Sequence, residues 1–344
     1  MRDSDGKGRE RIGAASLVRI AVFAALLGVI LYVLSVTVFD GASWFKRGWI
    51  INRNARVAAI EAEPENTIDV LALGNSLGVS AICPPEMWDR YGITVFNCGQ
   101  DGANPVETCA VAERILTMQK PKICLIETDM LYQGNKDMML RQVALKMPFQ
   151  NAFPMIRYHN VWMTAVQVHP FRTYFKGYLV NGVTDAYTGG AYYEPTQERE
   201  EIKPIYLYYL RKMIRVLRSR GVVPVLYSAP SPGNYSMARH NRISDLAAEE
   251  DVLYYDMNED PEAIGINWQE DTRDGGMHLN VRGAAKVSLD LADLLTSRYA
   301  LEDHRGQAGY EDWENMIPIY RQTADEMSGT CYTELEEPFG IINW

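Results

Sequence analysis

Two short segments of this sequence carry side chains that suit nucleophilic catalysis. Ser76 follows the apolar run 68–73, so its hydroxyl is expected at the end of a buried strand. Asp274 and His278 lie far along the chain, in one segment that also contains adjacent glycines. A serine, an imidazole and a carboxylate together make an activated serine nucleophile. The pattern therefore predicts an acyl-transfer site built from both segments.

Each of these residues also has a purely structural interpretation. Ser76 precedes an expected helix, where a serine commonly serves as the N-cap. An imidazole that titrates near neutral pH suits a general base, but His278 is equally placed to be a surface loop histidine. Asp274 is the expected acid that orients the imidazole, and Asp271 is the alternative. Either aspartate could instead form a turn.

The elements that must position these residues alternate along the chain. Strand-like runs are expected at 68–73, 94–97, 122–127, 222–228 and 252–256. A short helix is expected after Ser76, and longer helices are expected at 105–119, 204–220, 237–250 and 281–297. This alternation predicts an α/β fold with a central parallel sheet. Active sites of such sheets lie beyond the carboxyl ends of the strands, which is where Ser76 falls.

Three motifs in this region resemble those of the SGNH/GDSL hydrolases. Residues 74–77, Gly-Asn-Ser-Leu, are similar to the Gly-Asp-Ser-Leu motif that follows the first strand of the family. Asp274 and His278 are similar to the late Asp-x-x-His motif. The segment 97–102 is similar to a block whose last glycine, here Gly102, gives a backbone N–H to the oxyanion hole.

The resemblance covers roughly residues 67–298 and implies both a fold and a mechanism. The implied fold is a three-layer, flavodoxin-like α/β domain whose central parallel sheet has about five strands. Ser76 would be the nucleophile, His278 the base and Asp274 the orienting acid. The backbone N–H groups of Ser76 and Gly102 would form the oxyanion hole. Gly102 could instead serve only a tight turn.

The sequence departs from the family pattern in three places. Asn75 stands where aspartate is common, and Asp274 precedes His278 by four residues rather than three. The block after the third strand, usually Gly-x-Asn-Asp, reads Ile-Glu-Thr-Asp at 126–129, which leaves the usual asparagine donor unidentified. In these departures the chain resembles the membrane-anchored members that act on cell-surface polymers, including proteins of the alginate-acetylation and D-alanylation type.

Several further residues are weaker candidates for the site. Asn75 is a candidate third oxyanion donor, or a hydrogen-bonding brace in place of the family aspartate. Asn104 and Thr128 are candidates for contact with the substrate. His159, within an aromatic-rich insertion, is another candidate, with a structural histidine as the alternative. Ser231 follows the fourth strand, where it would line the cleft or belong to an ordinary loop.

Composition excludes some classes of function. The chain has 344 residues, 47% of them hydrophobic, so it can bury a large core. Its formal net charge of −10 argues against nucleic acid as a partner, because phosphate binding needs a basic surface. The sequence contains no P-loop, zinc-ligand spacing or dinucleotide fingerprint, so neither a metal nor a cofactor is expected.

The N-terminal part contains an apolar run, 20–39, of the length that a bilayer span requires. Basic residues precede the run, which favours a cytoplasmic N-terminus with the remainder outside. A cleaved signal peptide is the competing interpretation. The run is longer than a usual signal core and no Ala-x-Ala site follows it, so an uncleaved anchor is preferred.

The expected organisation follows from these observations. The segments are a cytoplasmic N-terminus (1–19), a transmembrane helix (20–39), a membrane-proximal linker (40–66), a hydrolase-like domain (67–300) and a C-terminal extension (301–344). Residues 130–200 form an insertion within the domain, expected to be a helical lid or a wall of the substrate groove. The extension either packs on the domain or docks elsewhere.

The cysteines do not indicate a disulfide framework. Their number is odd, and the sequence places them at 83, 98, 109, 124 and 331. Cys98 and Cys109 would pair in an oxidising compartment, but buried free thiols are the preferred interpretation. Cys124, in an apolar run, is expected to be a small buried hydrophobic residue.

These inferences lead to a functional hypothesis. The chain is expected to be a membrane-anchored, extracytoplasmic serine esterase or O-acyltransferase that acts on acylated glycans of the cell envelope. One alternative is a non-catalytic binding or assembly protein on a degenerate fold. The other is an accessory protein that works with a multi-spanning membrane acyltransferase.

Overall fold

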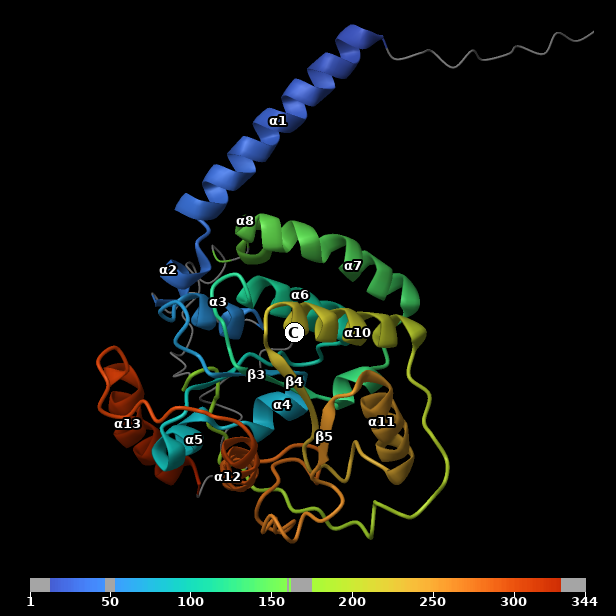
Figure 1. Ribbon diagram of the computed structural model, residues 1–344, viewed down its shortest axis with the longest axis vertical. Coiled ribbons are helices and arrows are strands. Elements are labelled where there is room, and N and C mark those ends of the chain that lie inside the picture. The colour runs from blue at the N-terminus through green and yellow to red at the C-terminus, as the bar shows by residue number, and fades with distance from the viewer. Residues whose placement is uncertain (1–12, 47–52, 160, 162–174, 329–344) are drawn as a thin grey trace, which may run out of the picture.

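The sheet at the centre of the molecule has five parallel strands in the order β2-β1-β3-β4-β5. The computed structural model describes residues 13–46, 53–159, 161 and 175–328 (Figure 1). The strands are β1 (Val70–Leu73), β2 (Val95–Asn97), β3 (Ile123–Glu127), β4 (Val223–Ser228) and β5 (Leu253–Asp256). This strand order is that of flavodoxin-like folds, so the expected three-layer α/β class is confirmed.

The strands form because their residues are apolar on both faces. All residues of β1 are buried: Val70 and Ala72 belong to one hydrophobic core, and Leu71 and Leu73 belong to the other. Successive side chains of a strand point to opposite faces, so a strand between two helical layers needs a continuous apolar run. This is why the run 68–73 identifies a central strand.

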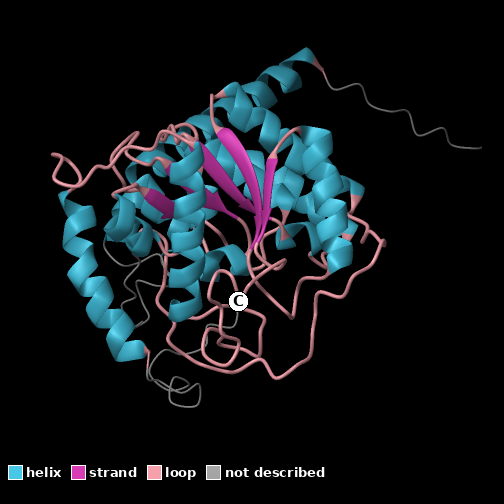
Figure 2. Cartoon of the chain, turned by 60° about the horizontal axis from the view of Figure 1, so that its bottom comes forward, coloured by secondary structure: helices cyan, strands magenta, loops and turns pink. Residues whose placement is uncertain are grey.

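Helices cover both faces of the sheet (Figure 2). The helices that follow the strands in the sequence are α4 (Ser76–Ala81), α5 (Pro84–Tyr91), α6 (Pro105–Ile115), α10 (Pro204–Ser219), α11 (Met237–Glu250) and α12 (Val281–Arg298). Side chains of α6, α10 and α11 enter one core, and side chains of α5 and α12 enter the other. The short helix expected after Ser76 is present, but a second helix, α5, follows it and was not expected.

A long apolar helix stands at the N-terminal end. This helix, α1 (Ala14–Thr37), begins before the expected run 20–39, and nearly all of its described residues are exposed. It is long and apolar enough to cross a membrane, a property that signal sequences share. At the C-terminal end of α1, called its base below, the backbone N–H of Met155 donates a hydrogen bond to Ser35 Oγ at 3.1 Å. The helices α2 (Gly41–Lys46) and α3 (Ala55–Glu61) then lead into β1.

The insertion 130–200 has its own structure in the part that is described. A short 3₁₀ helix (Asp129–Tyr132) is followed by α7 (Asp137–Ala152) and α8 (Pro154–Tyr158). These two helices lie at the same end of the molecule as the base of α1 (Figure 1). Residues 175–200 instead run as an extended strap toward the other end, where long loops gather (Figure 1).

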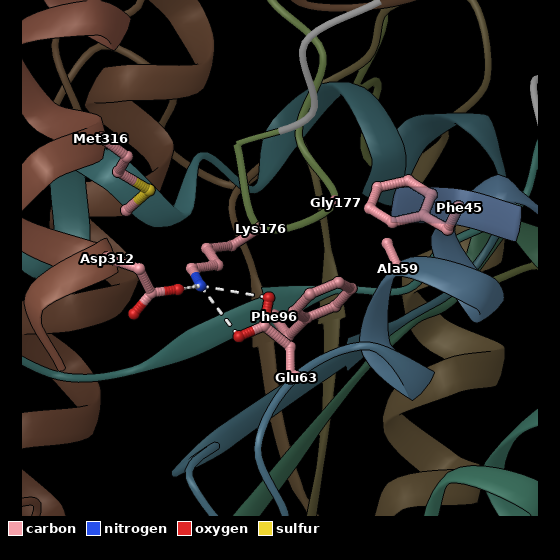
Figure 3. Close-up of a pocket in the computed structure, with 8 residues that line it drawn as sticks. All are labelled: Phe45, Ala59, Glu63, Phe96, Lys176, Gly177, Asp312 and Met316. Carbon is pink, nitrogen blue, oxygen red and sulfur yellow. Dashed lines mark hydrogen bonds and ion pairs between the residues drawn. The ribbon is translucent and has the colours of Figure 1, made fainter. Parts of the chain in front are cut away.

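The C-terminal extension packs on the domain through α13 (Glu311–Met327). The rings of Trp313 and Trp88 lie 5.3 Å apart, and Lys176 Nζ lies 4.6 Å from the centre of the Trp313 ring. Lys176 also pairs with Glu63 at 2.8 Å and with Asp312. Figure 3 shows this lysine between the two carboxylates, at a hollow of about 200 Å³.

The described cysteines are buried free thiols: Cys83, Cys98, Cys109 and Cys124. Burial raises the pKa of Cys98 and of Cys109 to about 12, so neither is a nucleophile at neutral pH. Cys331 lies outside the described residues.

Replacement of Trp313 by alanine tests whether the extension is an integral part of the core. Trp313 is almost completely buried, so we expect Trp313→Ala to lower the free energy of unfolding by about 3–5 kcal/mol. Ile319→Ala on the exposed side of α13 is the control, with an expected change within about 0.5 kcal/mol. Denaturant unfolding of the full chain in detergent, followed by circular dichroism, measures both. Equal values for the two variants would contradict the packing described here.

Candidate active site

Ser76 is held at the carboxyl end of β1 by a tight strand-to-helix turn. The side chain of Asn75 accepts a hydrogen bond from the backbone N–H of Leu77 at 3.0 Å and thereby caps α4. The capping alternative for Ser76 is therefore wrong, because Asn75 is the N-cap of α4. A Cβ atom on Gly74 would lie only 2.5 Å from the Cβ of Glu127, so the close approach of β3 requires glycine there.

The imidazole of His278 lies between Ser76 and Asp274. Its Nε2 is 2.8 Å from Ser76 Oγ, and its Nδ1 is 2.6 Å from Asp274 Oδ2. A carboxylate only accepts, so Nδ1 carries the proton and Nε2 is free to accept from the serine hydroxyl. The structure thus brings together the three residues that the sequence singled out.

The spacing of four residues between acid and histidine is accommodated by the loop itself. Gly275 and Gly276 have φ angles of +66° and +92°, a region that strongly favours glycine. The turn lets Asp274 accept a second hydrogen bond, from the backbone N–H of His278 at 2.6 Å. Burial raises the pKa of Asp274, but the hydrogen bonds that this carboxylate accepts from His278 outweigh burial, so the pKa lies below its usual value.

The alternative acid, Asp271, has a different role. It is fully buried and pairs with Lys286 Nζ at 2.5 Å, and it also accepts from the backbone N–H of Asn267. The orienting position beside His278 is occupied by Asp274 alone among the described residues.

The loop after β2 lies against the Ser76 turn, as the oxyanion-hole prediction requires. The backbone N–H of Gln100 donates to the carbonyl of Gly74 at 3.0 Å. Gly102 is exposed on this loop with a φ of +63°, which also fits the tight-turn alternative. No backbone partner among the described residues takes the N–H of Gly102. Its role as an oxyanion donor stays a prediction.

A buried brace lies behind the nucleophile, and the sequence indicated only its first member, Asn75. Asn75 Nδ2 donates to Asp129 Oδ2 at 2.6 Å, and Asp129 pairs with Arg239 at 2.9 Å. Arg239 also pairs with Glu200 at 3.0 Å. The amide of Asn75 is thus committed to Asp129, the bracing alternative, rather than aimed at an oxyanion. The only sequence signal for the rest of the brace was the pair of acidic residues at the end of the third strand, Glu127 and Asp129.

Glu127, the first of these acidic residues, is fully buried beside the turn. It accepts from the hydroxyl of Tyr235 at 2.5 Å and from the backbone N–H of Asp129 at 3.0 Å. Burial and the neighbouring Asp129 raise the pKa of Glu127 to about 8. The carboxyl group of Glu127 is therefore mostly protonated near neutral pH, whereas that of Asp274 is ionised.

The other candidates have protein partners. Asn104 is the N-cap of α6, Thr128 bonds to Ser228 and Tyr235, and both are buried. Ser231 is also buried, and its hydroxyl donates to the carbonyl of Met277 at 2.8 Å, next to the histidine. These contacts favour structural roles, and a role in substrate binding stays a prediction.

His159 is exposed at the end of α8, close to α1. The Nδ1 atom of His159 lies 2.9 Å from the carbonyl of Ile156. The loop that carries Asp274 and His278, called the catalytic loop below, belongs to the segment between β5 and α12, which lies at the opposite end of the domain (Figure 1). The structure does not bring His159 to the Ser76 site.

The strap that completes the insertion supports the catalytic loop. Backbone hydrogen bonds join Asp185 to both Thr272 and Gly275, at 3.0 and 3.2 Å. The ring of Tyr187 lies so close to Gly276 that a Cβ atom there would meet it at 2.9 Å. The strap therefore packs against the loop that carries Asp274 and His278.

No group of three or more His, Cys, Asp or Glu side chains within the described part of the chain is placed to hold a metal ion.

Comparison with known proteins gives matches only among solved structures, at low similarity. No family model matches this chain, and no match was found among curated proteins. The solved structures that resemble it include two proteins described as GDSL-type. A lipolytic protein of the G-D-S-L family from Desulfitobacterium hafniense is 13% identical with a TM-score of 0.38, over 67% of this chain and 100% of that one. A GDSL-like lipase from Bacteroides thetaiotaomicron is 11% identical with a TM-score of 0.39, over 72% and 98%. At these identities and TM-scores, the argument for an activity rests on the geometry of the site.

The orienting role of Asp274 is tested by its replacement with asparagine. Without the carboxylate, His278 is expected to adopt the tautomer that cannot accept the serine proton, so hydrolysis of p-nitrophenyl acetate should fall roughly 10³–10⁴-fold. The matched control is Glu270→Gln, an exposed position on the same loop, which should leave the rate unchanged. A fall of less than tenfold for Asp274→Asn would contradict the assigned role.

The raised pKa of Glu127 predicts a pH dependence of stability. Between the ordinary value of 4.5 and about 8 the folded chain retains a proton that the unfolded chain loses. Stability from this group is therefore complete below pH 4.5 and declines until about pH 8. We expect the unfolding temperature of the native chain to fall over this range more steeply than that of Glu127→Gln. Parallel curves in calorimetry would contradict the shifted pKa.

Proposed function

We propose that this protein is a membrane-anchored, extracytoplasmic serine esterase or O-acyltransferase that acts on acyl esters of cell-envelope glycans. The observation that carries the proposal is the chain of hydrogen bonds from Ser76 through His278 to Asp274, at 2.8 and 2.6 Å. Such an alignment provides a nucleophile, its base and the group that orients the base.

The geometry supports a two-step reaction. As Ser76 Oγ attacks the acyl carbon, its proton passes to His278 Nε2, and Asp274 stabilises the imidazolium that forms. The oxyanion is received by the backbone N–H groups of Ser76 and Gly102. The imidazolium then protonates the departing alcohol, which leaves an acyl group on the serine.

The second step reverses these proton movements. Water or a glycan hydroxyl gives its proton to His278 Nε2 and attacks the acyl-serine, and the proton then returns to Ser76 Oγ. Water yields a hydrolase and a glycan hydroxyl yields a transferase, with the same residues in both cases.

The proposed location follows from α1 and the basic residues that precede it. A positively charged N-terminal flank favours its retention in the cytoplasm, which puts the α/β domain outside. The catalytic loop lies at the end of the domain away from α1 (Figure 1), so the site faces polymers of the envelope rather than the bilayer.

The non-catalytic alternative predicts separated triad residues, and the 2.8 Å contact between Ser76 and His278 counts against it. An accessory role with a membrane acyltransferase uses the same triad, with the partner as acyl donor.

Labelling by a fluorophosphonate probe tests the proposed activity. The full chain in detergent should react, because the base makes Ser76 nucleophilic, and Ser76→Ala and His278→Ala should each abolish labelling. Ser297→Ala, an exposed serine on α12, is the control that should label normally. Labelling that persists in Ser76→Ala would show that another residue reacts, and would overturn the proposed mechanism.

A further inference from the structure

The helix α7 has apolar side chains on two opposite sides. Its inner side packs on the domain: Leu140 is fully buried, and Val143 and Ala144 pack against the same core. A helix at the surface of a soluble domain normally presents polar residues on its other side. Here the outer side is apolar too.

The outer side of α7 is a stripe of three large side chains. Met138 is 72% exposed, Leu145 73% and Phe149 59%. Their spacing of seven and four residues places them on one face of a helix. Uncovered apolar side chains grouped on one element mark an interaction surface. This stripe is called the outer stripe below.

Basic residues flank the outer stripe. Arg141 and Lys146 are exposed on either side of it, and Lys136 is exposed at the N-cap. Asp137 is the only acidic residue of α7, in a chain whose formal net charge is −10. An apolar face with basic flanks is the pattern of a helix that lies in the headgroup region of an anionic membrane.

The outer stripe is also at the right end of the molecule. The helix α8 follows α7 directly, and the N–H of its Met155 bonds to Ser35 at the base of α1. Figure 1 shows α7 and α8 beside the base of α1, at the end of the domain remote from the catalytic loop. A bilayer crossed by α1 would therefore meet α7 first.

We propose that the outer stripe of α7 docks into the lipid headgroup region of the leaflet from which α1 emerges. This inference rests on the proposed membrane anchor. The stripe gives the domain a second contact with the bilayer, so that the domain does not swing freely on α1. The Ser76 site is thereby held facing away from the lipid.

The test places a fluorophore on the outer stripe of the full chain in vesicles. Leu145→Cys and the control Ile319→Cys, each combined with Cys331→Ser, are labelled with an environment-sensitive dye; the four described cysteines are buried and do not compete. Ile319 is similarly exposed, at 55%, but lies on α13. The vesicles contain phosphatidylcholine and phosphatidylglycerol, with or without lipid that carries a shallow nitroxide quencher.

We expect about a twofold loss of emission from the label at position 145 and little loss at 319, because an interfacial helix lies within reach of the quencher. Equal emission from both labels, in a chain that floats with the vesicles, would overturn the docking and leave the anchor intact. A protein partner on this face would give that same result, since these vesicles contain none. A chain that fails to float would overturn the anchor and the docking together. Fluorophosphonate labelling of the same samples reports separately on the proposed chemistry.

Discussion

The hydrogen bonds of His278 join two parts of the chain that are separated by 202 residues, and the site depends on their alignment. Ser76 is positioned by the end of β1. His278 lies on a loop instead, and hydrogen bonds with Asp274 and with the strap position that loop. Asp274 holds both the ring and the backbone of His278, so one carboxylate sets position and tautomer together. The sheet, the capped helices and the strap all serve to keep this loop over the strand end.

The surroundings of the nucleophile show how the altered motifs are compensated. In place of the aspartate of the Gly-Asp-Ser-Leu motif, Asn75 both caps α4 and donates to Asp129. Asp129 is stabilised in turn by Arg239. Burial keeps the pKa of the neighbouring Glu127 high, which avoids two full negative charges side by side. Two of the three departures from the SGNH/GDSL pattern, Asn75 and the block 126–129, thus form one connected hydrogen-bonded unit.

Local patterns predicted the parts of the structure that local physics determines. The five strands followed from apolar runs. Ser76 was singled out by its place at the end of one of these runs, and Asp274 and His278 by their place in one late segment with adjacent glycines. The brace through Arg239 could not be predicted, because a charged residue on a helix gives no sign of a distant partner. Nor could α7, since apolar residues on both its sides erase the helical period. The strap that supports Gly276 is held by long-range contacts that leave no local signal.

The central claim is that Ser76 forms a covalent acyl intermediate. Peptide mapping by mass spectrometry, after brief exposure of the full chain to p-nitrophenyl acetate and an acid quench, tests this most directly. The account predicts an acetyl group on the peptide that contains Ser76, and its loss when His278 is replaced. An unmodified Ser76 peptide in a sample that hydrolyses the ester would contradict the account.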